Sequence, residues 1–283
     1  MSGNQNKPGT DREQAARHRE AGDYLAERGE YEGAIREYER STSFEEHDAS
    51  AQCALGDAYF CNEMPQAALN AYQNALKQQP KNAEAHFCLA EFWINYARFP
   101  AAIRALEKAV RCDPDRHYYR YRLGDLYVML GKFSAARHQY HQAIRLAPDN
   151  GFYRHKLADL HARLREWDRA ASLYESAVEC CPSEEFYSLR LSAVYIRQRS
   201  YAKAYLQLRR ACQMKPDNRA YMHILAELLM AMDEHAAALK AFQHAGRLDE
   251  YDRDWVRRWR NRTGLPSRLS ELRLATSFPK GRG

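Results

Sequence analysis

The chain has 283 residues, of which 45% are hydrophobic and 28% are charged. This balance is normal for an ordered globular protein and excludes a mainly disordered chain. The net charge of +6 is concentrated at one end, because residues 253–283 carry nine Lys or Arg and two acids, a net of +7, and the other 252 residues carry −1. A uniformly basic nucleic-acid-binding protein is therefore excluded, and nucleic acid is not the expected partner.

Residues 1–14 are polar and contain Gly and Pro, so we expect this N-terminal segment to be disordered. They lack the apolar run of a signal peptide, and no stretch of the sequence is apolar enough for a membrane span. The chain has seven cysteines, an odd number, without regular pairing along the predicted helices. That usage favours a reducing compartment, and the expected location is the cytoplasm.

From Ala15 to Asp252 the sequence repeats every 34 residues without an insertion. The seven repeats are residues 15–48, 49–82, 83–116, 117–150, 151–184, 185–218 and 219–252. Position 20 is alanine in all seven, from Ala34 to Ala238. Apolar residues three to four apart predict two amphipathic helices in each repeat, and the small residue at position 20 lets them approach closely. One such pair cannot bury both of its faces, so neighbouring repeats must stack.

The helix boundaries are also marked in the sequence. Asn82, Asn150 and Asn218 precede the first helix of three repeats and are predicted to cap it. Proline at position 32 ends the second helix in the second to sixth repeats, because proline cannot continue a helix.

Residues 253–262 are predicted to form one more helix, with Trp255, Val256 and Trp259 at near-helical spacing. We expect this helix to cap the exposed apolar end of the last repeat, as repeat arrays require. Residues 263–283 are basic and contain Gly and Pro, so we expect a flexible tail. Because the first repeat is acidic, the tail could instead dock in its own groove or reach another molecule, which makes self-association possible.

The repeated pattern resembles the tetratricopeptide repeat (TPR) family. The resemblance rests on alanine at position 20, Ala or Ser at position 27, a small residue at position 8 and a large one at position 24, over Ala15–Asp252. It implies an all-α protein, a right-handed α-solenoid of seven helix-turn-helix units followed by the capping helix. It also implies that the first helix of each unit lines a concave groove.

In this family, positions 2, 5, 9, 12 and 13 of the first helix face the groove. Position 9 is acidic in six of the seven repeats here, and positions 2 and 5 supply aromatic residues. The predicted peptide-binding groove consists of Asp57, Phe87, Glu91, Tyr118, Tyr121, Asp125, Phe152, His155, Asp159, Arg163, Phe186, Arg190 and Arg197. The acids can be ligand contacts or can merely solvate the groove. We favour a binding role, because exposed aromatic residues on a scaffold usually mark contact sites.

Some members of the family grip the C-terminal carboxylate of chaperones with a clamp of Lys, Asn and Arg. Only Arg190 matches that pattern here, so binding of this chaperone tail is not supported. The chain also lacks a glycine-rich phosphate loop, a Gly-x-Ser-x-Gly turn and a Cys-x-x-Cys pair. We therefore expect no catalytic site, no metal and no cofactor.

The sequence thus predicts a scaffold or adaptor that binds a peptide segment or partner helix of another protein in its groove. The alternative is a tether that attaches to nucleic acid or an anionic surface through the Arg-rich tail.

Overall fold

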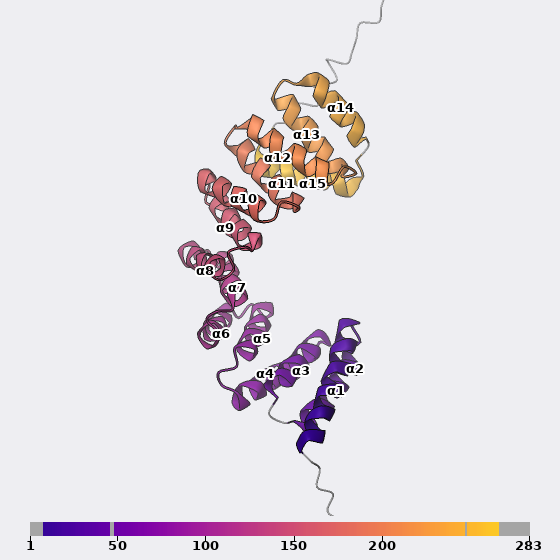
Figure 1. The fold of residues 1–283 in the computed structure, drawn as a ribbon, viewed down its shortest axis with the longest axis vertical. Coiled ribbons are helices and arrows are strands. Elements are labelled where there is room, and N and C mark those ends of the chain that lie inside the picture. The colour runs from indigo at the N-terminus through magenta and orange to yellow at the C-terminus, as the bar shows by residue number, and fades with distance from the viewer. Residues whose placement is uncertain (1–7, 46–47, 247, 266–283) are drawn as a thin grey trace, which may run out of the picture. The chain divides into compact units, whose positions relative to one another are not determined.

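A computed structural model describes residues 8–45, 48–246 and 248–265. Every regular element in these ranges is a helix, as Figure 1 shows. The helices are α1 (Pro8–Glu27), α2 (Tyr31–Phe44), α3 (Ala49–Cys61), α4 (Pro65–Gln78), α5 (Ala83–Asn95), α6 (Phe99–Cys112), α7 (His117–Met129), α8 (Phe133–Leu146), α9 (Gly151–Arg163), α10 (Trp167–Cys180), α11 (Glu185–Arg197), α12 (Tyr201–Met214), α13 (Arg219–Ala231), α14 (His235–Ala245) and α15 (Glu250–Thr263).

The chain divides into two compact units, an N-terminal unit of residues 1–146 and a C-terminal unit of residues 147–283. In each unit every odd-numbered helix up to α13 packs against the next helix in the chain. Within a unit, the second helix of one pair also packs against the first helix of the next, as α4 does against α5 and α10 against α11. The all-helical fold of stacked pairs is therefore confirmed, whereas the count of seven TPR units and the right-handed superhelix stay predictions.

The predicted contact positions form the core of both units. The alanine at position 20 of each repeat is completely buried, from Ala34 to Ala238. Position 27 is buried as well, from Ser41 to Ala245. Because solvent does not reach the side chain at position 20 in any repeat, the two helices of a pair lie in close contact there.

Local signals determine where the helices begin and end. The side chains of Asn82, Asn150 and Asn218 accept hydrogen bonds from backbone N–H groups at the starts of α5, α9 and α13, which confirms the predicted caps. The residue at position 15 of each repeat, just before the second helix, has a positive φ. This residue is a glycine in the first and fourth repeats, Gly29 and Gly131, and a different residue in the other five repeats, for example Ala97. A left-handed residue reverses the chain between the two helices of a pair.

Two boundaries differ from the sequence prediction. Helix α1 begins at Pro8, so residues 8–14 are helical and are not part of a disordered segment. Proline is favourable at the start of a helix because its missing N–H would be unbonded there anyway. Residues 1–7 lie outside the described ranges.

The final helix, α15, also differs from the expected capping helix in position. It spans Glu250–Thr263, longer than the predicted 253–262, and its main contacts are with α13 and α11. Both are first helices of their pairs, so α15 lies along the first-helix face of the C-terminal unit and is not confined to the end of the last repeat. Thr263 and Leu265, assigned to the flexible tail, are buried, and the rest of that tail lies outside the described residues.

Candidate functional site

The acidic row at position 9 is held by tyrosines of the second helices. Tyr38 donates its hydroxyl to Asp23 at 2.7 Å, and Tyr72 donates to Asp57 at 2.6 Å. The same bond joins Tyr140 to Asp125, and Tyr174 to Asp159 at 2.5 Å. These carboxylates therefore connect the two helices of a pair, which is a structural role that the sequence analysis missed.

A signal for this role exists in the sequence. Aspartate occupies position 9 in the four repeats that have tyrosine at position 24, and in no other repeat. Where position 24 is Leu208, position 9 is Ala193, so neither half of the pair is present. The correlation arises because the hydroxyl at position 24 and the carboxylate at position 9 are hydrogen-bonding partners.

In the N-terminal unit, the predicted residues of α5 and α7 form an aromatic and charged surface, here called the N-terminal face. It consists of Phe87, Glu91, Tyr118, Tyr121 and Asp125. The rings of Phe87 and Tyr118 have centroids 5.5 Å apart, and those of Tyr118 and Tyr121 are 5.6 Å apart. Tyr118 is 41% exposed and Phe87 is half-buried, so both offer ring surface to a ligand.

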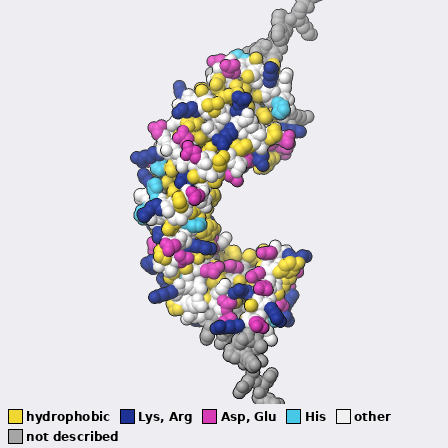
Figure 2. Space-filling model, in the orientation of Figure 1, with side chains coloured by type: hydrophobic (Ala, Val, Ile, Leu, Met, Phe, Trp, Pro, Cys, Tyr) yellow, Lys and Arg dark blue, Asp and Glu magenta, His cyan; other side chains and the backbone are white. Residues whose placement is uncertain are grey.

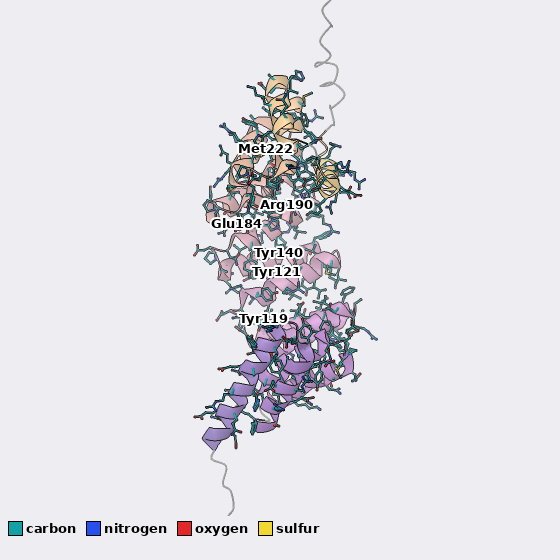
Figure 3. The ribbon with its side chains drawn as sticks, turned by 90° about the vertical axis from the view of Figure 1, so that its right-hand side faces the viewer. Tyr119, Tyr121, Tyr140, Glu184, Arg190 and Met222 are labelled. Carbon is teal, nitrogen blue, oxygen red and sulfur yellow. The ribbon has the colours of Figure 1, made fainter. Side chains whose placement is uncertain are left out.

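Tyr121 differs from the expectation that it is an accessible groove contact. Its side chain is buried, and it hydrogen-bonds to Asp125, the acceptor that it shares with Tyr140. Burial, together with this carboxylate, raises the pKa of the Tyr121 phenol above its usual value. Tyr121 and Tyr140 lie next to each other in Figure 3. Tyr121 is therefore the buried aromatic member of the N-terminal face, whereas Phe87 and Tyr118 reach the surface.

The charged residues of the N-terminal unit are partly paired. Arg122 of α7 donates to Glu91 of α5 through two guanidinium nitrogens, and its Nε lies 2.8 Å from Glu91 Oε1. This hydrogen bond raises the pKa of Arg122 above its usual value. Asp57 is more exposed than Glu91 and Arg122. It lines a polar cavity of about 330 Å³ together with Asp23 and Glu84. In Figure 2, Asp and Glu side chains lie close together on the visible face of this unit.

In the C-terminal unit, the structure brings the predicted residues of α9 and α11 together around His155. This buried ring lies 5.0 Å from the ring of Phe186 and 6.2 Å from that of Phe152, measured between centroids. The guanidinium of Arg190 lies over Phe186, 4.7 Å from its centroid. Phe152 and Phe186 are each 37% exposed. His155 is thus part of the packing, whereas the two phenylalanines lie at the surface.

Helix α15 covers part of this surface with its own side chains. Arg262 donates to Asp159 at 2.9 Å, and Arg260 binds Glu227 of α13. Trp259 is buried, and the ring of Trp255 lies 5.6 Å from that of Tyr221. The sequence contains no periodic signal for these contacts, because α15 is not a repeat.

The predicted Arg163, Arg190 and Arg197 lie around one cavity in the C-terminal unit, between α9, α11 and α15. Arg197 donates to the backbone carbonyls of Asn261 and Arg262 at 3.1 and 2.6 Å. These carbonyls lie in the last turn of α15, where the backbone C=O groups have no partner within the helix. Arg197 therefore anchors the C-terminal end of α15.

The described residues contain no group of three or more His, Cys, Asp or Glu side chains placed to hold a metal ion. Within the same ranges, no helix has both the length and the apolar character needed to cross a membrane.

Comparisons with known proteins identify the repeats. Models of the tetratricopeptide repeat match residues 62–126 and 121–185, and a TPR repeat model matches residues 22–62. No curated protein matches the sequence.

Similar solved structures include pilF of Pseudomonas aeruginosa, with 19% identity and a TM-score of 0.61 over 73% of this chain and 94% of that one. YrrB, a TPR protein, is 20% identical, with a TM-score of 0.53 over 69% of this chain and 97% of that one. TTC0263 of Thermus thermophilus, another TPR protein, is 21% identical, with a TM-score of 0.51 over 64% of this chain and 99% of that one. At these identities the likeness concerns the fold. Since the fold, the buried repeat positions and the matched models agree, the chain belongs to the tetratricopeptide repeat family.

Proposed function

We propose that this protein is an interaction scaffold that binds a segment of a partner protein on its N-terminal face. The observation that carries the proposal is the half-exposed pair Phe87 and Tyr118, which lies beside the Glu91–Arg122 ion pair. Aromatic anchors next to oriented charges are typical of peptide-binding surfaces. YrrB, whose fold is similar, is a TPR protein with an unusual peptide-binding site, which supports this class of function.

The corresponding face of the C-terminal unit is less accessible. Helix α15 contacts α11 and α13, and its arginines bind Asp159 and Glu227. A partner helix cannot occupy the same place while α15 is docked. The N-terminal face is therefore the surface that we assign to the main partner.

The test compares variants of the full chain as bait in affinity capture followed by mass spectrometry. Phe87→Ala with Tyr118→Ala removes the aromatic pair. We expect the affinity for captured proteins to fall at least about ten-fold, because aromatic hot spots contribute about 2 kcal/mol or more each. The matched control is Leu206→Ala, which truncates an apolar side chain that is 61% exposed on a second helix. Circular dichroism confirms that all variants remain helical.

The same experiment separates the scaffold from the alternative tether. A chain that ends at Leu265 lacks most of the basic tail but keeps the N-terminal face. If the tail is the binding element, this truncation abolishes capture, and binding by the full chain falls steeply with salt. Capture that survives the double alanine substitution but not the truncation would contradict the proposed scaffold function.

A further inference from the structure

Another cavity of the N-terminal unit lies between the ends of α4 and α6 and the start of α5. It measures about 370 Å³, is here called the Cys112 cavity, and is lined by Leu76, Pro80, His86, Lys108, Arg111 and Cys112. The last three residues come from α6, the second helix of its pair. None of the lining residues belongs to the N-terminal face, so the Cys112 cavity is a separate feature of this unit.

The positive charges of the cavity have no counter-charge. Lys108 and Arg111 are exposed, and neither forms an ion pair or a hydrogen bond within the described ranges. No carboxylate of the described residues lines the cavity. Burial lowers the pKa of His86 below its usual 6.5, and the charges of Lys108 and Arg111 lower it further, so the imidazole is neutral at pH 7. The lining therefore carries a net charge of about +2, which attracts an anion.

His86 adds a hydrogen-bond acceptor to the lining. Its Nε2 lies 3.0 Å from the carbonyl oxygen of Pro80, so Nε2 carries the proton of the neutral ring and donates it. Nδ1 is then an acceptor, and it has no hydrogen-bond partner among the described residues. The side chain is only 7% exposed, so packing fixes the position of the ring. A ligand that carries both anionic groups and N–H groups would match this lining.

The cavity also contains a nucleophile, the thiol of Cys112. This cysteine is free and half-buried, and it occupies position 30 of the third repeat. Cys180 occupies the same position in the fifth repeat, where Ser176 and Glu179 stand in place of the two cations. The positive charge beside Cys112 is therefore not a packing requirement of the repeat.

We propose that the Cys112 cavity binds an anionic disulfide of low molecular mass and that Cys112 is the residue that this disulfide modifies. The Cys112 thiolate attacks one sulfur of the ligand, the ligand S–S bond breaks, and a mixed disulfide forms on Cys112. The other half of the ligand leaves as a thiolate and takes up the proton that Cys112 lost. Cys112 is thus oxidised and the departing half is reduced. This inference does not depend on the proposed function.

Oxidised glutathione has the required chemistry, because its carboxylates suit Lys108 and Arg111 and its amide N–H groups suit Nδ1 of His86. The experiment treats the full chain, without reducing agent and at low ionic strength, with oxidised glutathione or with neutral bis(2-hydroxyethyl) disulfide. Peptide mass spectrometry follows the rate of modification at Cys112 and at Cys61, an exposed thiol outside the cavity. The intrinsic reactivity of a thiol affects both reagents, so the ratio of the two rates reports the binding of the anion.

We expect the anionic-to-neutral rate ratio to be at least about five-fold higher at Cys112 than at Cys61, because the cations raise the local concentration of the anionic reagent. The difference should shrink in 1 M salt, where the Debye length is about 3 Å. Lys108→Gln with Arg111→Gln should reduce the ratio at Cys112 to that at Cys61. The control, Lys108→Arg with Arg111→Lys, keeps both charges and should retain most of the selectivity.

Three outcomes would overturn the proposal. The first is that oxidised glutathione does not modify Cys112, and the second is that the rate ratio at Cys112 is no higher than at Cys61. The third is a ratio that the two glutamine substitutions leave unchanged. Both substituted side chains are exposed, and circular dichroism confirms that the variants remain helical. The capture experiment on the N-terminal face uses other residues, so failure of either experiment leaves the other unaffected.

Discussion

The ion pair between Arg260 and Glu227 offers a sharp test of how α15 is attached. The Glu227 side chain is 1% exposed, and its carboxylate binds the guanidinium of Arg260. Arg260→Met keeps the length and apolar stem of the side chain but leaves the carboxylate buried without its partner. Removing one member of a buried ion pair costs about 3 to 5 kcal/mol.

At pH 7.5 the carboxylate can avoid part of this cost by regaining water, which requires release of α15. Release exposes Trp259 and Val256, which are buried in the docked helix. Each buried apolar side chain contributes about 1.5 to 3 kcal/mol, so undocking costs a similar amount. Either route predicts that Arg260→Met lowers the free energy of unfolding of the C-terminal unit by about 3 kcal/mol at pH 7.5.

The assay is urea unfolding followed by tryptophan fluorescence, since Trp255 and Trp259 lie on α15. The control is Arg257→Met on the same helix, whose ion pair with Asp254 is exposed and should contribute less than about 1 kcal/mol. The double variant Arg260→Met with Glu227→Leu removes both charges and should recover most of the loss. Equal stability of Arg260→Met and Arg257→Met would refute the reasoning.

The effect of Arg260→Met should also depend on pH through His223, whose Nδ1 lies 3.6 Å from Glu227. Burial lowers the pKa of His223 below its usual 6.5, Glu227 opposes this shift, and Arg260 adds to it. The folded state therefore binds fewer protons, and the wild type loses stability as pH falls from 6.5 toward the folded pKa. Without Arg260, protonated His223 can pair with Glu227. The stability difference between wild type and Arg260→Met should thus shrink from pH 7.5 to pH 5.5, and a constant or growing difference would contradict this account.

Two further predictions concern the repeats. Ala136 is 0% exposed at position 20, so Ala136→Leu should overpack the contact between α7 and α8 and lower the free energy of unfolding by about 1 to 3 kcal/mol, and an unchanged urea midpoint would refute the repeat register. Ala97 has a φ of +53°, so Ala97→Gly should raise the free energy of unfolding by about 1 kcal/mol. Gly131 has a φ of +70°, so Gly131→Ala should lower the free energy of unfolding by about the same amount. Urea midpoints that shift in the same direction for both variants would contradict this turn geometry.

The repeats and their caps could be predicted from the sequence because each rests on contacts between residues close in the chain. Position 20 packs within its own helix pair, so the same packing requirement returns every 34 residues and produces the period. The cap of Asn82 is equally local, since its side chain reaches the N–H of Ala85 three residues later. Each such signal recurs in several repeats, and this recurrence makes the pattern recognisable in a single sequence.

The candidate binding surfaces depend on contacts that have no such period. Tyr121 was predicted to be accessible from its position in the repeat, but burial against its neighbours and the carboxylate of Asp125 decide its actual role. The bond between Arg262 and Asp159 joins residues 103 apart in the chain. The sequence predicts helix α15 but not its place on α11 and α13, which is decided by the tertiary packing of this single non-repeated helix. The arginine-lined cavity that α15 completes depends on the same packing. A helix with an apolar stripe can pack on any complementary surface, so its own residues do not specify which one it covers.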